Sequence, residues 1–323
     1  MTGLAAPRRQ LGTSDLLVSP VGYGCWPIAG ITSVVHSQSE CVATIQAALD
    51  AGVNFMDTAY SYGYAGESDE LLRQALRGRR TEAIIASKVG MHYDRQHKRV
   101  LDATPATLLA HAQQILKRLD VEAVDVMYLH TPDGQTPIED SAGALAEIVR
   151  RGWARYAAVS NVSADEAERF NAVCPVIAIQ PHFNMLQQDA VVGLRDFCRR
   201  HNVALVCYWV LMKGLLAGHL QRDHQFDPRD RRLTYEIFKG EQWQRSQDFL
   251  DRLRAIAVRT ECTVSQLVIA WTLAQKDITV ALCGAKHPAQ IIDNAGGMRL
   301  QLEDTTLAEI DACIAAAGTL SSS

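Results

Sequence analysis

Short apolar runs alternate with longer segments of mixed apolar and polar residues along most of the chain. Short apolar runs are typical of buried strands, and apolar residues that recur about every 3.6 positions are typical of amphipathic helices. The predicted strands are Val21–Gly24, Asn54–Asp57, Ala83–Lys88, Val124–His130, Ala154–Ser160, Val176–Gln180, Ala204–Tyr208 and Ile278–Cys283.

The segments between these strands carry helical periodicity, and their ends hold residues suited to helix boundaries. Ser37 and Thr104 are good N-cap residues, whereas Gly52 and Gly152 suit helix C-termini. The predicted helices include Ser37–Ala51, Thr104–Leu119, Pro137–Arg151, Ser163–Ala172 and Asp189–His201.

Eight strands that alternate with helices in a chain of 323 residues predict the α/β class and a (β/α)8 barrel of the TIM type. We expect a single domain over residues 1–323, because no linker rich in Pro, Gly or Ser interrupts the pattern. A doubly wound sheet is the alternative. The segment GYGCWPIAG after the first strand, however, lacks the glycine spacing of a dinucleotide-binding turn.

Two segments lie outside the eightfold pattern. The stretch Arg9–Ser19 has strand-type residues on both sides of a polar turn, and it predicts an N-terminal β-hairpin that closes the bottom of the barrel. The insertion Lys213–Gln242 contains the run QRDHQFDPRDRR, which we expect to be too polar to pack. A long loop in a compact domain is usually functional, and a merely solvated excursion is the alternative.

Composition excludes several classes of function. The formal net charge is −4 and no basic stripe is visible, so nucleic-acid binding has no support. The longest apolar run, Val203–Met212, is about half a membrane crossing, and the first residues lack the core of a secretory signal. The cysteines include no C-x-x-C pair, and Cys198 with His201 forms a lone C-x-x-H. We therefore expect a reduced, cytoplasmic protein without a metal site.

Polar side chains follow several predicted strands at the point where each strand ends. Asp57, Lys88 and His130 each end an apolar run, and Tyr62 lies in the loop after Asp57. The carboxyl ends of barrel strands form the reactive face, so we expect Lys88 to meet Asp57 and Tyr62 to reach both. Each residue alone has an ordinary explanation, exposure for the lysine and a structural role for the histidine. Together on one rim they favour a catalytic site.

The chemistry of such a cluster follows from its charges. A nearby ammonium favours tyrosinate, so we expect Lys88 to lower the pKa of Tyr62 toward neutrality, with Asp57 keeping the ammonium charged. Tyr62 would then be a general acid or base, and His130 would orient a carbonyl oxygen. Because no thiol pair or metal set is evident, a hydride-carrying cofactor is the economical source of electrons.

These residues lie in segments that resemble the aldo-keto reductases, and the resemblance extends along nearly the whole chain. The segments are VNFMDTAYSYGYAGESDELL, IIASKVG and VDVMYLHTPD. The resemblance implies a catalytic tetrad of Asp57, Tyr62, Lys88 and His130. It also implies NADP-dependent interconversion of an aldehyde or ketone and its alcohol, with Tyr62 as general acid/base.

The resemblance also implies a cofactor site. Ser160, Asn161 and Gln180 would hold the nicotinamide carboxamide, and Tyr208 would stack on the ring. Lys286, in CGAKHPAQIIDNAGG, would meet a 2′-phosphate, which favours NADP while leaving NAD possible. The other cofactor contacts that the resemblance implies are Leu211, Gly214, Leu215, Gly284, Ala285, Gln290 and Asn294.

The substrate side is less determined by the sequence. Trp26, His92 and Tyr93 lie in loops after the first and third strands, where they would contact a carbonyl or sugar substrate. Where the family often shows Ser-Pro before a leucine, this chain has Trp209 and Val210. An aldose dehydrogenase, a non-catalytic cofactor-binding partner subunit and an unrelated barrel lyase or isomerase remain alternatives, and the oligomeric state stays open.

Overall fold

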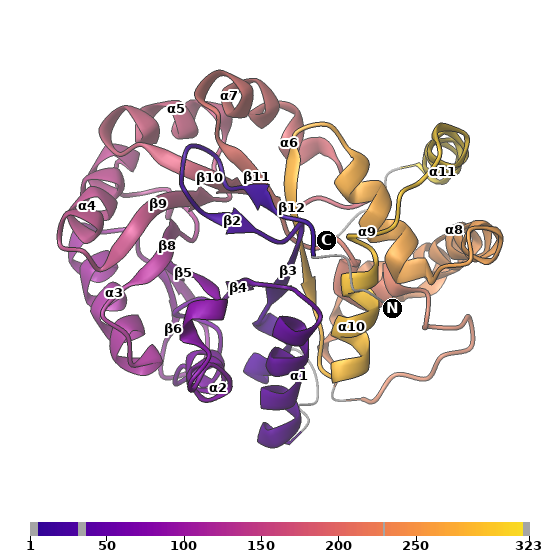
Figure 1. Ribbon diagram of the computed structural model, residues 1–323, viewed down its shortest axis with the longest axis horizontal. Helices are drawn as coiled ribbons and strands as arrows, with labels where there is room; N and C mark the ends of the chain where they lie inside the picture. Colours follow the sequence, from indigo (N-terminus) through magenta and orange to yellow (C-terminus); the bar gives the residue numbers. More distant parts are fainter. Residues whose placement is uncertain (1–5, 32–36, 229, 319–323) are drawn as a thin grey trace.

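Eight parallel strands form a closed barrel in the computed structural model, which describes residues 6–31, 37–228 and 230–318 (Figure 1). The strands follow one another in chain order around the barrel, and β12 pairs with β3 to close it. They are β3 (Val21–Gly24), β4 (Phe55–Asp57), β5 (Ile84–Val89), β8 (Val124–Leu129), β9 (Ala154–Ser160), β10 (Val176–Gln180), β11 (Ala204–Cys207) and β12 (Ile278–Gly284). Each predicted strand is present with ends within one residue, so the predicted barrel is confirmed.

Helices surround the barrel and pack on its outer face through a continuous apolar layer (Figure 1). They are α1 (Gln38–Asp50), α2 (Glu67–Ala75), α3 (Pro105–Leu119), α4 (Ile138–Arg150), α5 (Ala164–Val173), α6 (Asp189–Val192), α7 (Leu194–His201), α9 (Val264–Ala274) and α10 (Pro288–Gly296). The Ser37 hydroxyl accepts from the Glu40 amide at 3.3 Å, which caps α1 as predicted. The predicted helix Asp189–His201 is two helices, separated at Gly193, a poor helix former.

An N-terminal hairpin closes the amino end of the barrel, as predicted. Strands β1 (Arg9–Gln10) and β2 (Leu17–Val18) pair antiparallel and lie across the barrel in Figure 1. Buried side chains from this segment pack into the barrel interior with those of the strands. The Asp15 carboxylate in the turn accepts from the Arg155 guanidinium at 2.8 Å, which ties the hairpin to β9. The reactive end of the barrel is therefore the opposite, carboxyl end.

A second hairpin follows β5 at the carboxyl end. Strands β6 (Met91–Tyr93) and β7 (Arg99–Leu101) pair antiparallel, with Tyr93 opposite Arg99. The sequence predicted only a loop here. Directly opposed residues of an antiparallel pair project from the same face, so this hairpin presents Tyr93 and Arg99 together.

The insertion between β11 and α9 packs against the barrel instead of remaining a polar excursion. It contains the short helices η3 (Met212–Ala217), η4 (Arg231–Thr234) and η5 (Glu236–Phe238), while Arg229 lies outside the described residues. Inside the supposedly polar run, the Phe226 ring centroid lies 5.6 Å from that of Phe238. The Arg232 guanidinium lies 5.1 Å from the Phe226 ring centroid. The expectation that this run cannot pack was wrong, because arginine side chains can stack on aromatic rings.

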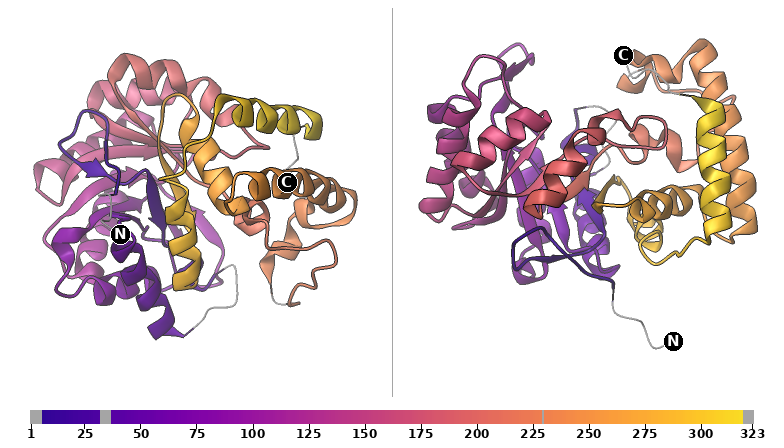
Figure 2. Two further views of the ribbon diagram at one scale, coloured as in Figure 1. Left: turned by 45° about the vertical axis from the view of Figure 1, so that its right-hand side comes forward. Right: turned by 90° about the horizontal axis from the view of Figure 1, so that it is seen from above.

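The insertion leads into α8 (Gly240–Arg259), which packs beside the C-terminal helix α11 (Asp304–Ala317) at one side of the barrel (Figure 2). Among the helices that the structure describes, none combines the length and the apolar character needed to cross a membrane.

Substitution of Gly12 in the β1–β2 hairpin tests how tightly this hairpin packs against the amino end of the barrel. Its φ is +58°, and a Cβ there would lie 2.1 Å from the Ile177 carbonyl oxygen. We predict that Gly12→Ala lowers the free energy of unfolding by about 2–4 kcal/mol, because left-handed strain adds to displacement of β10. Gly134→Ala is the matched control, with φ +73° and no atom within 4 Å of the added Cβ, and should cost only about 1 kcal/mol. If urea unfolding shows that Gly12→Ala and Gly134→Ala lose equal free energy of unfolding, Gly12 is not closely packed against β10.

Candidate active site

A buried ion pair between Asp57 and Lys88 lies at the carboxyl ends of β4 and β5. The Lys88 Nζ donates to the Asp57 Oδ1 at 2.5 Å, and each residue is 1% exposed. The strands are adjacent, and Asp57 lies opposite Ala86 in the register. Buried charges persist in proteins when they are paired and hydrogen-bonded. The prediction that Lys88 is the distant partner of Asp57 is therefore confirmed.

The remaining hydrogens of the Lys88 ammonium are also used. Its Nζ donates to the Thr58 carbonyl oxygen at 3.0 Å and to the Tyr62 Oη at 3.2 Å. An ammonium has three N–H donors, and here they meet a carboxylate, a carbonyl and a phenol. Tyr62 is thus held directly by the charged pair, as the sequence predicted.

Gln180, on β10 across the barrel, binds the second carboxylate oxygen of Asp57. Its Nε2 donates to the Asp57 Oδ2 at 2.8 Å, and the side chain is buried. Both carboxylate oxygens of Asp57 therefore have donors. The sequence predicts that Gln180 holds the nicotinamide carboxamide, and the structure shows that its amide nitrogen binds Asp57.

Two rings flank Tyr62. The His130 ring lies edge-on to it with centroids 6.1 Å apart, and the Trp26 ring with centroids 5.1 Å apart. Burial lowers the pKa of His130 well below its usual value, and the charges of Lys88 and Arg99 act in the same direction. The imidazole is therefore neutral at physiological pH, and its Nδ1 has no hydrogen-bond partner in the part of the chain that the structure describes. A neutral imidazole still offers one N–H donor.

The pKa of Tyr62 differs from the sequence expectation. Burial raises this pKa well above its ordinary value, and the Asp57 carboxylate acts in the same direction. Lys88 was expected to lower it toward neutrality, but the ammonium and the carboxylate form one nearly neutral pair beside the phenol. Desolvation, which disfavours tyrosinate, then decides the direction. Tyr62 is accordingly a protonated phenol in this state.

The tetrad opens onto a cavity of about 650 Å³. The cavity extends from Tyr62 and Trp26 to α10, and η3, η4 and the segment around them form one wall. The residues singled out from the sequence that line it are Trp26, Asp57, Tyr62, His130, Tyr208, Leu211, Gly214, Gly284, Ala285, Lys286, Gln290 and Asn294. Those that do not line it are Lys88, His92, Tyr93, Ser160, Asn161, Gln180 and Leu215.

Ser160 and Asn161 lie beside the cavity, bonded to their neighbours. The Asn161 Nδ2 donates to the His130 carbonyl oxygen at 3.0 Å, and its Oδ1 accepts from the Tyr208 hydroxyl at 2.8 Å. The Ser160 hydroxyl donates to the Gln180 carbonyl oxygen at 2.7 Å. This chain of bonds fixes the position of the Tyr208 ring in the cavity wall.

Two of the three predicted substrate contacts lie elsewhere. The His92 ring is 5.5 Å from that of His111, and the Tyr93 ring is 5.1 Å from that of Tyr64. Met91 lines the cavity, whereas its neighbour His92 does not, because successive residues of a strand project to opposite faces. Of the predicted set, only Trp26 lines the cavity.

The far end of the cavity is cationic. Burial lowers the pKa of Lys286, Arg232 acts in the same direction, and Asp230 opposes both, so these three groups share one neighbourhood. Gly284 forms a tight wall here, since a Cβ on it would lie 2.5 Å from the Pro27 Cγ. Positive charge at one end and aromatic and hydrogen-bonding groups at the other fit a phosphorylated dinucleotide.

Sequence reasoning missed several lining residues, including Arg99, Arg232, Lys213 and Tyr235. For Arg99 a signal was available, since the alternating stretches around DRQHK are typical of a hairpin. In the described part of the chain, no three His, Cys, Asp or Glu side chains gather in a metal-binding arrangement.

Comparison with known proteins agrees with the fold. The model of the Aldo/keto reductase family matches residues 20–315. The chain belongs to the aldo-keto reductase family. Aldo-keto reductase str7 from Strobilurus tenacellus is 31% identical over 314 residues, which cover 94% of this chain and 90% of that protein. Aldo-keto reductase yakc of Schizosaccharomyces pombe, whose name specifies NADP(+), is 30% identical, covering 96% and 92% of the two chains.

A solved structure is also similar over its full length. The glycerol dehydrogenase from Gluconobacter oxydans superimposes with a TM-score of 0.88 at 29% identity, covering 97% of this chain and 96% of that one. The comparisons therefore show the oxidoreductase family and support the closed barrel, and the N-terminal hairpin is seen in the structure.

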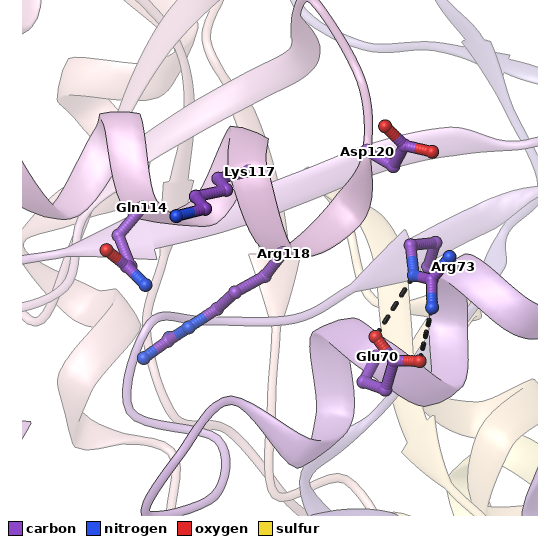
Figure 3. Close-up of a pocket in the computed structure, with 6 residues that line it drawn as sticks. All are labelled: Glu70, Arg73, Gln114, Lys117, Arg118 and Asp120. Carbon is purple, nitrogen blue, oxygen red and sulfur yellow. Dashed lines mark hydrogen bonds and ion pairs between the residues drawn. The ribbon is translucent and has the colours of Figure 1, made fainter.

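A second hollow, of about 330 Å³, lies between α2 and the end of α3 in this aldo-keto reductase (Figure 3). Its acidic and basic side chains include the ion pair of Arg73 with Glu70. From the same hollow, Arg118 extends to the buried Asp69, with Nη1 and Oδ2 3.7 Å apart. The hollow is a charged surface feature. It is connected to the active site by the contact of Arg118 with Asp69.

Asp69 supports the loop that carries the tetrad. Its Oδ1 accepts from the Thr58 hydroxyl at 2.8 Å, and Thr58 supplies the carbonyl oxygen that holds Lys88. Burial raises the pKa of Asp69 to about 7, although the Thr58 bond and Arg118 act to lower it.

Because the folded protein binds this proton more tightly than the unfolded chain, the contribution of Asp69 to stability is greatest at low pH. We predict that it declines as the pH rises from about 4 to about 7, where the folded state must ionise a buried carboxyl. The unfolding free energy of the wild type should therefore fall relative to that of Asp69→Asn as the pH rises across this range, because the variant cannot ionise. Parallel pH profiles of the two proteins would contradict the raised pKa.

Proposed function

We propose that the protein is an NADP-dependent oxidoreductase that interconverts an aldehyde or ketone and the corresponding alcohol, with Tyr62 as general acid/base. The observation that carries this proposal is the position of Tyr62. It lines the cavity, and its Oη lies 3.2 Å from the Nζ of Lys88 in the buried Lys88–Asp57 pair. A phenol in this position can exchange a proton with a ligand on one side and be stabilised on the other.

The side chains define the proton transfer. Tyr62 and His130 both line the cavity, so a carbonyl oxygen placed between them can accept a hydrogen bond from each. Tyr62 then gives its proton to that oxygen. The tyrosinate left behind lies beside the Lys88 ammonium, which stabilises it far more than it stabilises the neutral phenol. The raised pKa of the resting phenol and an effective proton transfer are therefore compatible, because Lys88 acts on the charge that develops.

Asp57 and Gln180 act on the substrate only indirectly, through Lys88. Asp57 keeps the Lys88 ammonium charged, and Gln180 holds the second oxygen of that carboxylate. Neither needs to change its protonation during the reaction. Both are positioning residues for Lys88, and Lys88 in turn positions Tyr62.

The cofactor end of the cavity supports NADP. Lys286 and Arg232 would hold phosphate groups, Gln290 and Asn294 line the same end, and Tyr208 borders the reactive end. Bound there, the dinucleotide would supply or accept the hydride at the carbonyl carbon. The positive charge at Lys286 favours the cofactor with the additional 2′-phosphate, and NAD remains possible. The name of the Schizosaccharomyces pombe relative agrees with this preference.

The alternatives differ in substrate or in catalysis. A sugar or polyol dehydrogenase would use the same groups in the oxidative direction, and the Gluconobacter oxydans neighbour is titled a glycerol dehydrogenase. A non-catalytic cofactor-binding subunit is disfavoured by the hydrogen-bonded group of Asp57, Lys88 and Tyr62. Rates with NADPH and an aldehyde, compared with NADP and an aldose or glycerol, separate the catalytic alternatives.

Tyr62→Phe tests the assignment of the acid. We predict that turnover of an aldehyde with NADPH falls by about a hundredfold to ten-thousandfold, since a positioned general acid is worth this much. The dissociation constant of NADPH, measured by fluorescence, should change little. Tyr60→Phe is the matched control from the same loop, because Tyr60 stacks on His111 outside the cavity. Turnover of Tyr62→Phe near that of the control would contradict the assignment.

Lys286→Met tests the cofactor preference. We predict that the dissociation constant of NADPH rises by about tenfold or more while that of NADH is almost unchanged, because only NADPH carries the 2′-phosphate. Lys276→Met removes an exposed lysine far from the cavity lining and should alter neither. An equal loss for both cofactors would place Lys286 elsewhere on the dinucleotide.

A further inference from the structure

Arg99 lines the reactive part of the cavity, although no catalytic or cofactor role in the proposed function uses it. It begins β7, and the register of the β6–β7 hairpin sets it opposite Tyr93. Met91, two residues before Tyr93 and on the same face of β6, also lines the cavity. Arg99 and Met91 of this hairpin therefore border the same cavity as Tyr62 and His130.

The charge of Arg99 affects the pKa values of residues at the reactive end of the cavity. After burial and Lys88, it is the third cause that lowers the pKa of His130. It also acts on Tyr208, where burial raises the pKa and Arg99 opposes that rise. These two residues border the position of the reacting carbonyl, so Arg99 lies within electrostatic range of a bound substrate.

Arg99 has no carboxylate of its own within the described chain. Its side chain makes neither an ion pair nor a hydrogen bond with any residue that the structure describes, whereas the cavity-lining Arg232 is paired with Asp230. The carboxylates that line the described cavity are Asp57 and Asp293. Asp57 is bound to Lys88, and Asp293 accepts from the Thr263 hydroxyl at 3.0 Å.

The other cations near the cavity are occupied or distant from the hairpin. Lys213 lies over the Trp209 and Tyr235 rings at 4.9 and 4.5 Å from their centroids. Arg231, whose charge reaches Tyr93 together with that of Arg99, donates to the Ile31 carbonyl oxygen at 3.4 Å. Lys286 and Arg232 belong to the cofactor end. Of the two arginines that line the cavity, Arg232 is paired with Asp230, and Arg99 has no anionic partner among the described residues.

We propose that Arg99 determines specificity by binding an anionic group of the substrate, so that the preferred substrate is a carbonyl compound carrying a carboxylate or phosphate. This inference rests on the proposed function. A guanidinium presents parallel N–H donors that match the oxygens of either group, and such charge-assisted bonds are stronger than neutral ones. The anchored end fixes the carbonyl end against Tyr62 and His130, with the Trp26 ring beside them.

The reaction itself is balanced as for any carbonyl reduction. The carbonyl carbon gains a hydride, its oxygen gains the Tyr62 proton, and the C=O π bond is replaced by a C–H and an O–H bond. A bound NADPH would supply that hydride, and solvent returns a proton to Tyr62. The anionic group of the substrate stays unchanged, so Arg99 affects binding and orientation and leaves the redox chemistry to the tetrad.

Matched substrates test the proposal. Succinate semialdehyde and butanal differ in a terminal carboxylate, and glyceraldehyde phosphate and glyceraldehyde differ in a phosphate. In the wild type we expect kcat/KM to favour the anionic member of at least one pair by about tenfold to hundredfold. The pair that shows the larger ratio identifies the carboxylate or the phosphate as the natural anion.

Variants of the hairpin assign the preference to Arg99. Arg99→Met should reduce the anionic-to-neutral ratio of kcat/KM to near one, mainly through KM, and Arg99→Lys should retain part of it. Lys98→Met is the matched control, because Lys98 is the adjacent exposed cation and does not line the cavity. Its ratio should equal that of the wild type. A wild type without preference in either pair would overturn the proposal, as would a preference that survives in Arg99→Met.

Binding without turnover separates this inference from the proposed function. Calorimetry with the reduced product of succinate semialdehyde, against butanol, should show tighter binding of the anionic alcohol to the wild type and no difference in Arg99→Met. If no aldehyde is turned over with NADPH, the proposed function fails, and this binding difference alone decides the role of Arg99. If Arg99→Met weakens NADPH binding as much as it weakens the anionic alcohol, Arg99 belongs to the cofactor site and the proposal is overturned.

Discussion

The buried ion pair of Lys88 with Asp57 is the interaction on which the rest of the site depends. Removing one partner from such a pair leaves an uncompensated buried charge, which typically costs about 3–5 kcal/mol. Here the pair persists because every donor and acceptor around it is used, by Thr58, Tyr62 and Gln180. The residues come from β4, the loop after it, β5 and β10, so only a closed barrel brings them together. The closure of the barrel and the position of the Tyr62 hydroxyl are therefore coupled.

The segments outside the strand–helix alternation give this barrel its particular cavity. The β1–β2 hairpin closes the amino end, so the carboxyl end is the open one. On that end, the β6–β7 hairpin contributes Met91 and Arg99, and the insertion between β11 and α9 contributes Lys213, Arg232 and Tyr235. The strand ends hold Asp57, Lys88 and His130, whereas these segments supply further residues of the cavity wall.

Much of this could be predicted from the sequence. Each strand is a short apolar run, and the period of the pattern identifies it wherever the run is long enough. Asp57, Lys88 and His130 were found because each interrupts or ends such a run, and the parallel barrel brings strand ends to one rim. The β6–β7 hairpin was read as a loop because its strands, MHY and RVL, have only three residues each, although the stretches around DRQHK gave a hairpin signal.

The electrostatics could not be predicted in the same way. The direction of the pKa shift of Tyr62 depends on how far the phenol is desolvated and on how closely Asp57 neutralises Lys88, and neither quantity is local in sequence. The same holds for Gln180, whose partner is 123 positions away, and for Arg232, whose stacking on Phe226 requires the folded insertion.

The central claim is that Tyr62 rests as a protonated phenol and ionises only when a proton acceptor is bound. Carbon NMR of protein with ring-labelled tyrosine measures this directly, with Tyr62→Phe used to assign the signal. The account predicts that the Tyr62 resonance keeps its phenol shift up to the ordinary tyrosine pKa of about 10. A change to the phenolate shift near neutral pH in the cofactor-free protein would contradict it.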